Sequence, residues 1–156
     1  MSYTEPFVPI PEDIIAKMLR MAAVKPGELV YDLGSGDGRI PIVAARDFRA
    51  RAVGVEIRKR LVDESRKKVK GQGLSGQVTI RHLSFRRVDL SRADVIATYL
   101  TSYVLNGLTP KFNRELRHGT RVVNFDYQIP DWTPAREVRV KPSGWKKEHP
   151  MYLYRV

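Results

Sequence analysis

Residues 32–38 read Asp-Leu-Gly-Ser-Gly-Asp-Gly and follow a short apolar run that is typical of a buried strand. Glycines at such a strand-to-helix turn let the backbone approach a ligand closely. Glu56 ends the next apolar run along the chain. A carboxylate at that position can accept hydrogen bonds from both hydroxyls of a ribose. The loop, its strand and Glu56 together predict a site for a ligand that contains adenosine.

Two kinds of cofactor compete for this arrangement. The dinucleotide fingerprint is Gly-x-Gly-x-x-Gly, which places a pyrophosphate at a helix N-terminus. This chain instead has Gly34-x-Gly36-x-Gly38, and Asp32 and Asp37 add negative charge to the loop. Negative side chains favour S-adenosylmethionine, because its sulfonium and ammonium groups are cations. A tight turn that binds no ligand is the alternative.

The elements that must position this loop alternate between strand and helix patterns. Short apolar runs predict strands at 28–33, 50–57, 78–80, 93–99 and 120–125. Apolar residues at helical spacing predict helices at 12–24, 38–48, 58–70 and about 109–116. Two further strands, 132–140 and 151–156, suggest an antiparallel hairpin. The expected fold is α/β: a Rossmann-like, doubly wound, mostly parallel sheet with a C-terminal antiparallel hairpin.

The length and composition fit one soluble domain. The 156 residues predict a single domain spanning 1–156, in which prolines at 6, 9 and 11 make 1–11 an extended N-terminal arm. Cysteine is absent, which excludes disulfides, thiolate metal sites and a cysteine nucleophile. No apolar run is long enough for a membrane span, and the N-terminus lacks a signal-peptide pattern, so we expect a cytoplasmic protein. The three histidines show no metal-ligand spacing.

The charge balance bears on the choice of partner. The formal net charge is +11, which should attract nucleic acid, acidic proteins or anionic membranes. A chain rich in arginine and without cysteine also has a thermophile-like composition, so the charge alone does not identify a nucleic-acid binder. The basic run 66–70 lies on the polar side of a predicted helix, which favours a solvated face.

Several motifs resemble the class I S-adenosylmethionine-dependent methyltransferases. Within that class the chain is similar to the small archaeal protein-lysine methyltransferases and to their eukaryotic relatives that modify lysines of mitochondrial proteins. The segments that carry this resemblance are 9–12, 32–40, 53–56, 98–100, 119–123 and 152–154. The resemblance covers nearly the whole chain and implies S-adenosylmethionine as the cofactor.

The resemblance also implies roles at matching positions. The expected cofactor-binding residues are Asp32, Gly34, Ser35, Gly36, Glu56, Ile57, Ser84, Phe85 and Tyr99. Gly34 and Gly36 would face the methionine part, Asp32 would brace the loop, and Glu56 would hold the ribose. Ile57 would cover the adenine, and Ser84-Phe85 would border its other side. Many class I enzymes have Asp or Asn where Ser84 stands, so this shorter side chain departs from the pattern.

The expected catalytic residues are Tyr99 and Asp126. A lysine amine has a free pKa of about 10.4 and must lose a proton before it can attack. Desolvation in an aromatic channel lowers that pKa, and Asp126 could orient the amine or accept its proton. The channel would be formed by Tyr99, Phe125, Tyr127 and Trp132. Tyr3 and Phe7 of the arm could form a lid over the cofactor, or the arm could simply lie on the core.

Two absences weaken the nucleic-acid alternatives. Residues 97–100 read Ala-Thr-Tyr-Leu, without the prolines of the motif that base-amine methyltransferases carry there, and pyrimidine C5 methylation needs a cysteine. The predicted function is therefore methyl transfer from S-adenosylmethionine to protein lysines with a broad substrate range. An RNA or DNA methyltransferase, or a non-catalytic binding module with the same fold, are the alternatives. Proteins with exposed lysines are the expected partners and nucleic acid is a second class; no membrane partner and no metal are expected.

Overall fold

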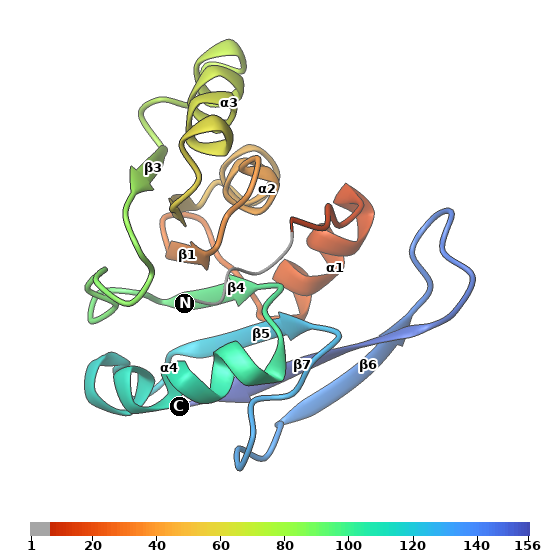
Figure 1. The fold of residues 1–156 in the computed structure, drawn as a ribbon. Helices are drawn as coiled ribbons and strands as arrows, with labels where there is room; N and C mark the ends of the chain where they lie inside the picture. The colour runs from red at the N-terminus through yellow and green to blue at the C-terminus, as the bar shows by residue number, and fades with distance from the viewer. Residues whose placement is uncertain (1–6) are drawn as a thin grey trace.

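The computed structural model describes residues 7–156, in which seven strands form one sheet (Figure 1). The helices are α1 (Glu12–Met21), α2 (Arg39–Phe48), α3 (Lys59–Gly71) and α4 (Ser102–Glu115). The strands are β1 (Leu29–Leu33), β2 (Arg51–Glu56), β3 (Val78–His82), β4 (Val95–Thr98), β5 (Arg121–Phe125), β6 (Arg136–Val140) and β7 (His149–Arg155).

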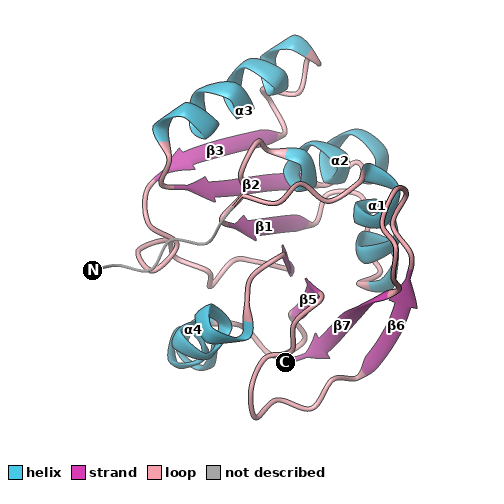
Figure 2. Ribbon diagram, turned by 45° about the vertical axis from the view of Figure 1, so that its right-hand side comes forward, coloured by secondary structure: helices cyan, strands magenta, loops and turns pink. Residues whose placement is uncertain are grey.

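The strand order is β3-β2-β1-β4-β5-β7-β6 (Figure 2). The first five strands pair in parallel, and β7 pairs antiparallel with both β5 and β6. The predicted α/β fold with a mostly parallel sheet and a C-terminal antiparallel hairpin is confirmed. The order reverses between β1 and β4, which is the place where open α/β sheets bind their ligands.

Helices cover both faces of the sheet and bury two apolar cores (Figures 1 and 2). On one face, α1, α2 and α3 pack their apolar sides on the strands; the core there includes Ile14, Val43 and Val62. On the other face, α4 and the segment 83–94 contribute Leu105, Phe112 and Leu90. Both faces being covered explains why β1 and β4 are almost continuously buried.

The helix α4 begins seven residues earlier than the sequence pattern predicts, at Ser102 rather than about 109. Its first half contains Tyr103, Asn106 and Gly107, which are weak helix formers, and Pro110 interrupts the pattern. Thr101 starts the helix, because its side chain accepts a hydrogen bond from the Val104 N–H at 3.4 Å.

Smaller differences occur at other boundaries. β6 begins at Arg136 rather than at 132, and β7 begins at His149 rather than at 151. Residues 7–11 of the predicted arm contain neither helix nor strand, whereas Tyr3 of the predicted lid lies outside the described residues. Within residues 7–156, no helix is long and apolar enough to cross a membrane.

Candidate functional site

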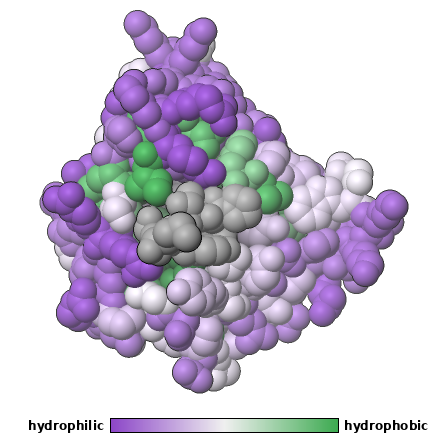
Figure 3. All heavy atoms as spheres, in the orientation of Figure 1, coloured by the Kyte–Doolittle hydropathy of each residue, from purple (hydrophilic) through white to green (hydrophobic). Residues whose placement is uncertain are grey.

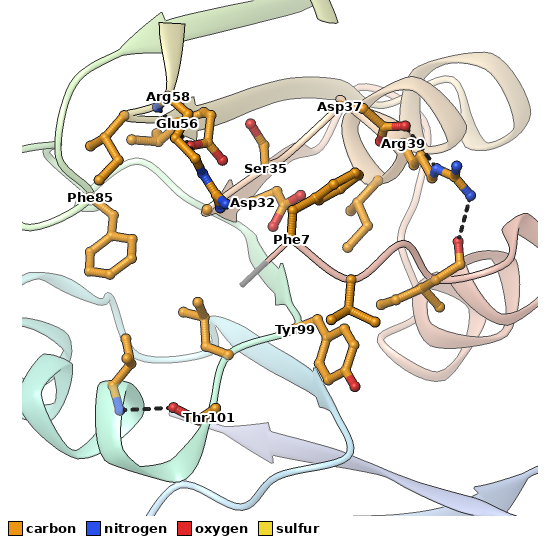
Figure 4. Close-up of a pocket in the computed structure, with 18 of the residues that line it drawn as sticks. Phe7, Asp32, Ser35, Asp37, Arg39, Glu56, Arg58, Phe85, Tyr99 and Thr101 are labelled. Atoms are coloured by element: carbon orange, nitrogen blue, oxygen red, sulfur yellow. Dashed lines mark hydrogen bonds and ion pairs between the residues drawn. The ribbon is translucent and has the colours of Figure 1, made fainter. Parts of the chain in front are cut away.

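A pocket of about 400 Å³ opens beyond the carboxyl ends of β1, β2 and β4 (Figure 4). The N-terminal arm, the glycine loop, the end of β2, the segment 83–86, the start of α4 and Tyr127 line it. Eight of the sequence-predicted cofactor residues lie on its walls: Asp32, Gly34, Ser35, Glu56, Ile57, Ser84, Phe85 and Tyr99. The other two predicted site residues, Gly36 and Asp126, are not part of this lining: Gly36 lies against Phe7 of the arm, and Asp126 bonds to Tyr99.

The pocket also gathers the exposed apolar side chains of the described structure. The large hydrophobic residues that remain exposed are Phe7, Val8, Ile57, Tyr103 and Tyr127, and all of them line the pocket. Figure 3 shows hydrophobic residues close to the grey atoms in the middle of this face, with hydrophilic residues around them. Exposed apolar groups concentrated in one hollow indicate a binding site rather than ordinary surface.

The glycine loop is bound to the end of β2. The N–H groups of Gly34 and Ser35 donate to the Val55 carbonyl oxygen at 2.8 and 2.9 Å, and the Gly36 N–H donates to Glu56 Oε1 at 2.9 Å. Gly36 has φ +57°, and a Cβ there would lie 2.5 Å from the Phe7 ring. The loop therefore needs glycine both for its conformation and for the close approach of the arm.

Glu56 is buried and rigidly held. Its Oε2 accepts hydrogen bonds from the N–H of Arg58 at 2.8 Å and from Arg58 Nε at 3.2 Å. Only 2% of the residue is exposed, although it lines the pocket. A carboxylate has about four acceptor positions, so Glu56 can still accept from ligand hydroxyls. Gly54, on the same strand as Glu56, leaves room for Ser35, since a Cβ there would lie 2.7 Å from Ser35 Oγ.

The two aspartates of the loop differ in charge compensation. Burial raises the pKa of Asp32 well above its usual range, and the nearby carboxylates of Glu56 and Asp37 raise it further. Burial also opposes ionisation of Asp37, but hydrogen bonds from Lys68 and Arg39 outweigh it and lower the pKa of Asp37. Of the two negative charges that the sequence places in the loop, the one at Asp32 is therefore uncompensated.

The basic run of α3 is exposed, and two of its residues also contact the rest of the fold. Lys68 Nζ lies 2.8 Å from Asp37 Oδ2, and Arg66 donates two hydrogen bonds to the Ile80 carbonyl oxygen. Both residues are nevertheless exposed, as the interpretation of 66–70 as a solvated face predicts. Ser65, beneath them, is fully buried with its Oγ 3.0 Å from the Gly36 carbonyl oxygen, so α3 supports the glycine loop directly.

The pocket chemistry fits S-adenosylmethionine. Asp32 lines the pocket, and the charges that shift its pKa are the carboxylates of Glu56 and Asp37; in the described part of the chain, Ser35 Oγ is buried without a hydrogen-bond partner. A buried polar group without a partner, such as Ser35 Oγ, requires an explanation, and a polar ligand supplies one; a cationic ligand would offset the negative charge of Asp32. Glu56 retains acceptor capacity for ribose hydroxyls, and Ile57 and Phe85 offer apolar surfaces for a base.

A second group of polar and aromatic residues lies at the carboxyl ends of β4 and β5. The Tyr99 hydroxyl donates to Asp126 Oδ2 at 3.3 Å. The Tyr99 ring packs edge-on against Phe125 and stacks on Tyr127, with ring centroids 5.0 and 6.2 Å apart. In Figure 4, Tyr99 lies on the opposite side of the pocket from Glu56 and Arg58. The two sequence-predicted catalytic residues, Tyr99 and Asp126, are therefore in direct contact.

Three residues of this region were missed by sequence reasoning. His149 Nδ1 lies 2.8 Å from Asp126 Oδ1, and Trp145 packs edge-on against His149 at 4.8 Å. Fully buried Asn124 bonds the loops after β4 and β5 to each other. An asparagine inside the apolar run 121–125 is the signal that could have revealed it, because a buried amide needs several partners.

Trp132 does not belong to the aromatic channel, and its predicted place there is wrong. Its ring packs edge-on against Phe112 and Tyr154, 6.0 and 5.9 Å away, in the core beneath α4. The chain turns after Ile129, whose N–H donates to the Tyr154 hydroxyl at 2.9 Å. This turn carries Trp132 away from the pocket, and sequence position alone does not reveal it.

The strand order and the pocket are those of the class I methyltransferases, which use S-adenosylmethionine as the methyl donor. The chain belongs to the family described as the ANTKMT methyltransferase domain, whose model matches residues 32–136. When bound, the cofactor supplies an electrophilic methyl group on a sulfonium sulfur.

Named relatives agree with this assignment. A protein-lysine N-methyltransferase of Saccharolobus islandicus is 40% identical over 99% of this chain and 96% of its own length. A human lysine N-methyltransferase named for a component of ATP synthase is 33% identical over 83% of this chain. The mouse adenine nucleotide translocase lysine N-methyltransferase is 32% identical over 85% of it. The matches cover only 54% and 58% of these two mammalian proteins.

Solved structures give the same fold. A Salinibacter ruber protein called an RNA methyltransferase, in complex with S-adenosyl-L-homocysteine, has a TM-score of 0.87 and 38% identity. The similarity covers 95% of this chain and 93% of that one. TrmN from Thermus thermophilus has a TM-score of 0.77, covering 93% of this chain and 49% of its own, but at 17% identity it supports the fold alone.

Proposed function

We propose that this methyltransferase transfers methyl groups from S-adenosylmethionine to lysine amines of proteins, with a broad range of acceptors. The observation that carries this proposal is the full-length similarity to the Saccharolobus protein-lysine N-methyltransferase. Two mammalian relatives named as lysine methyltransferases for different proteins support it further. The pocket is lined by the exposed rings of Tyr103 and Tyr127, which favours exposed lysines over one deeply bound substrate.

The glycine loop and the end of β2 would hold the cofactor. Asp32 offers an uncompensated negative charge to the cationic part, with Gly34 and Ser35 forming the adjoining wall and Gly36 behind the Phe7 ring. Glu56 would accept from the ribose hydroxyls. Ile57, Ser84 and Phe85 would border the adenine. Ser84 Oγ accepts from the Arg86 N–H at 3.2 Å and keeps its own hydrogen for donation.

Tyr99 and Asp126 would receive the lysine. A lysine ammonium must lose a proton before its nitrogen has a lone pair for attack, and its free pKa is about 10.4. The rings of Tyr99 and Tyr127 remove water around the ammonium and thereby favour its neutral form. Asp126 and the Tyr99 hydroxyl provide polar atoms that orient the amine. Orientation of this kind is the main requirement of an in-line displacement.

RNA methylation is the second candidate, for a specific reason. The Salinibacter structure that matches over nearly the full length carries the name RNA methyltransferase, and this chain has a net charge of +11. Basic surfaces bind nucleic acid through its phosphates whatever the chemistry of the site. The two candidates differ in the acceptor, so the acceptor must be measured.

Labelled methyl transfer to a mixed cell extract separates the two candidates. We expect label in protein, resistant to nuclease and removed by protease, with mass spectrometry assigning the methyl groups to lysine. Label that nuclease removes would favour RNA and contradict the proposal. Glu56→Ala should weaken cofactor binding in calorimetry about tenfold or more, because it removes charged hydrogen bonds. Glu64→Ala, on the exposed side of α3, is the matched control and should leave the affinity unchanged.

A further inference from the structure

Asp126 lies between two side chains that reach it from different strands. Its Oδ2 accepts from the Tyr99 hydroxyl at the end of β4, at 3.3 Å. Its Oδ1 lies 2.8 Å from Nδ1 of His149, the first residue of β7. A carboxylate can only accept hydrogen bonds, so Nδ1 carries the hydrogen of this contact. The two oxygens of Asp126 are therefore fixed separately, Oδ2 by Tyr99, which lines the pocket, and Oδ1 by His149 of β7.

The backbone of Asp126 is also held by β7. Asp126 has φ +78°, a left-handed conformation that is uncommon for residues other than glycine. Its N–H donates to the Pro150 carbonyl oxygen at 2.7 Å. The beginning of β7 thus bonds to Asp126 through both the side chain of His149 and the backbone of Pro150. Unusual backbone conformations persist where the surroundings determine them, and they concentrate at functional sites.

Aromatic rings prevent His149 from turning away. Its ring stacks on Phe125, with centroids 5.8 Å apart and an interplanar angle of 24°. Trp145 packs edge-on against it at 4.8 Å. The side chain of His149 is 26% exposed, and that of Asp126 is 18% exposed. The imidazole is therefore a fixed donor, which can set the orientation of the carboxylate that it contacts.

We propose that His149 is a positioning residue for methyl transfer, which rests on the proposed function. By holding Oδ1 of Asp126, it keeps Oδ2 and the Tyr99 hydroxyl where they can orient the incoming amine. His149 itself touches Asp126 and lies outside the lining of the pocket. A loss of this contact should leave the cofactor site intact, because Glu56 and the glycine loop lie on the other side of the pocket.

Three variants of the intact protein test this role. His149→Phe keeps a ring between Phe125 and Trp145 but removes the donor. His149→Asn keeps an amide donor close to the Nδ1 position and removes the ring. His118→Phe, at an exposed position between α4 and β5, is the matched control. Each is assayed for cofactor affinity by calorimetry and for steady-state methyl transfer to a lysine-containing protein.

We expect His149→Phe to bind cofactor like the wild type, with kcat reduced roughly tenfold to a hundredfold and KM for the acceptor protein unchanged. His149→Asn should regain most of the lost kcat. In an Asp126→Asn background, His149→Phe should have no further effect, because the two residues act as a unit.

Three results would overturn the proposal: wild-type kcat in His149→Phe, an asparagine variant as slow as the phenylalanine variant, or additive effects in the double variant. If the wild-type protein transfers no methyl group to protein lysine, the proposed function fails and the role of His149 falls with it. Transfer by the wild type together with unaffected His149 variants would refute the positioning role alone.

Discussion

At the scale of single residues, Asp32 combines burial with a charge that no described neighbour compensates. Burial first, and then the carboxylates of Glu56 and Asp37, raise the pKa of Asp32 in the folded protein. The folded state therefore binds a proton at Asp32 more tightly than the unfolded state does. The contribution of Asp32 to the free energy of unfolding therefore falls as the pH rises from its pKa in the unfolded chain to its raised pKa in the folded protein. Above the raised pKa this contribution is lost completely.

Asp32→Asn should therefore stabilise the cofactor-free protein at neutral pH by roughly 1–3 kcal/mol, since it removes a buried charge. The gain should shrink as the pH falls through the raised pKa of Asp32 and vanish near the unfolded value. The same variant should bind S-adenosylmethionine about tenfold more weakly or worse. Urea unfolding over a pH series and calorimetry measure the two effects.

The exposed Asp63, which pairs with Lys59 on α3, provides the matched control as Asp63→Asn. It should change neither the cofactor affinity nor the stability appreciably. A lower stability of Asp32→Asn at neutral pH would mean that Asp32 is a structural acceptor rather than a charge reserved for the cofactor.

At the scale of elements, Asn124 joins the segments that follow β4 and β5. Its Oδ1 accepts from the Leu100 N–H at 3.0 Å and from the Thr98 hydroxyl at 2.7 Å. Its Nδ2 donates to the carbonyl oxygens of Leu100, Phe125 and Tyr127. Tyr99 and Tyr127 lie on these two segments, so the amide sets their separation.

Asn124→Asp should destabilise the fold by roughly 3 kcal/mol, because it buries a charge against three carbonyl oxygens and removes the donor. The aromatic side of the pocket should loosen with it, which would lower methyl transfer more than cofactor binding. Urea unfolding measures the first effect and kcat the second.

Asn113→Asp, at an exposed position of α4, makes the same chemical change without burial and should be nearly neutral. Equal stability losses in the two variants would show that the amide of Asn124 does not hold the segments together.

The elements were largely predictable from the sequence, whereas their contacts were not. Alternating apolar runs revealed the strands and most helices, because burial on both faces leaves a local pattern. The early start of α4 was missed, since its first half depends on the Thr101 cap and on packing rather than propensity. The loop Asp32–Gly38 and Glu56 came together as predicted, because both lie at the carboxyl ends of neighbouring parallel strands. His149 reached Asp126 only through the antiparallel pairing of β7 with β5, which no local pattern encodes.

At the scale of the whole molecule, the pocket is an apolar hollow in a basic protein. The net charge is +11, and Arg39, Arg58 and Arg86 are among the pocket residues. Arg58 contacts Glu56 and Arg39 contacts Asp37, whereas Arg86 lies 6.0 Å from the centroid of the Phe85 ring. A positive field of this kind raises the rate of encounter with acidic partners.

Methyl transfer to an acidic, lysine-containing protein should therefore be salt-sensitive. We expect its kcat/KM to fall several-fold when the Debye length shortens from about 30 Å to about 3 Å with added salt. A basic acceptor protein with a similar number of lysines should lose no rate, and kcat for both should stay constant. Identical salt dependence for the two acceptors would exclude electrostatic steering by this surface.

The reversed direction of β7 separates the two ends of that strand. His149 lies beside Asp126 next to the pocket, while Val156 exchanges hydrogen bonds with Gly119 and Thr120 before the start of β5. Val156 is therefore at the far edge of the sheet, where the parallel strands begin. A fluorophore or a surface tether attached after Val156 would project away from the site. A protein immobilised in this way should keep its cofactor affinity, and the entrance of its pocket should stay accessible to large acceptor proteins.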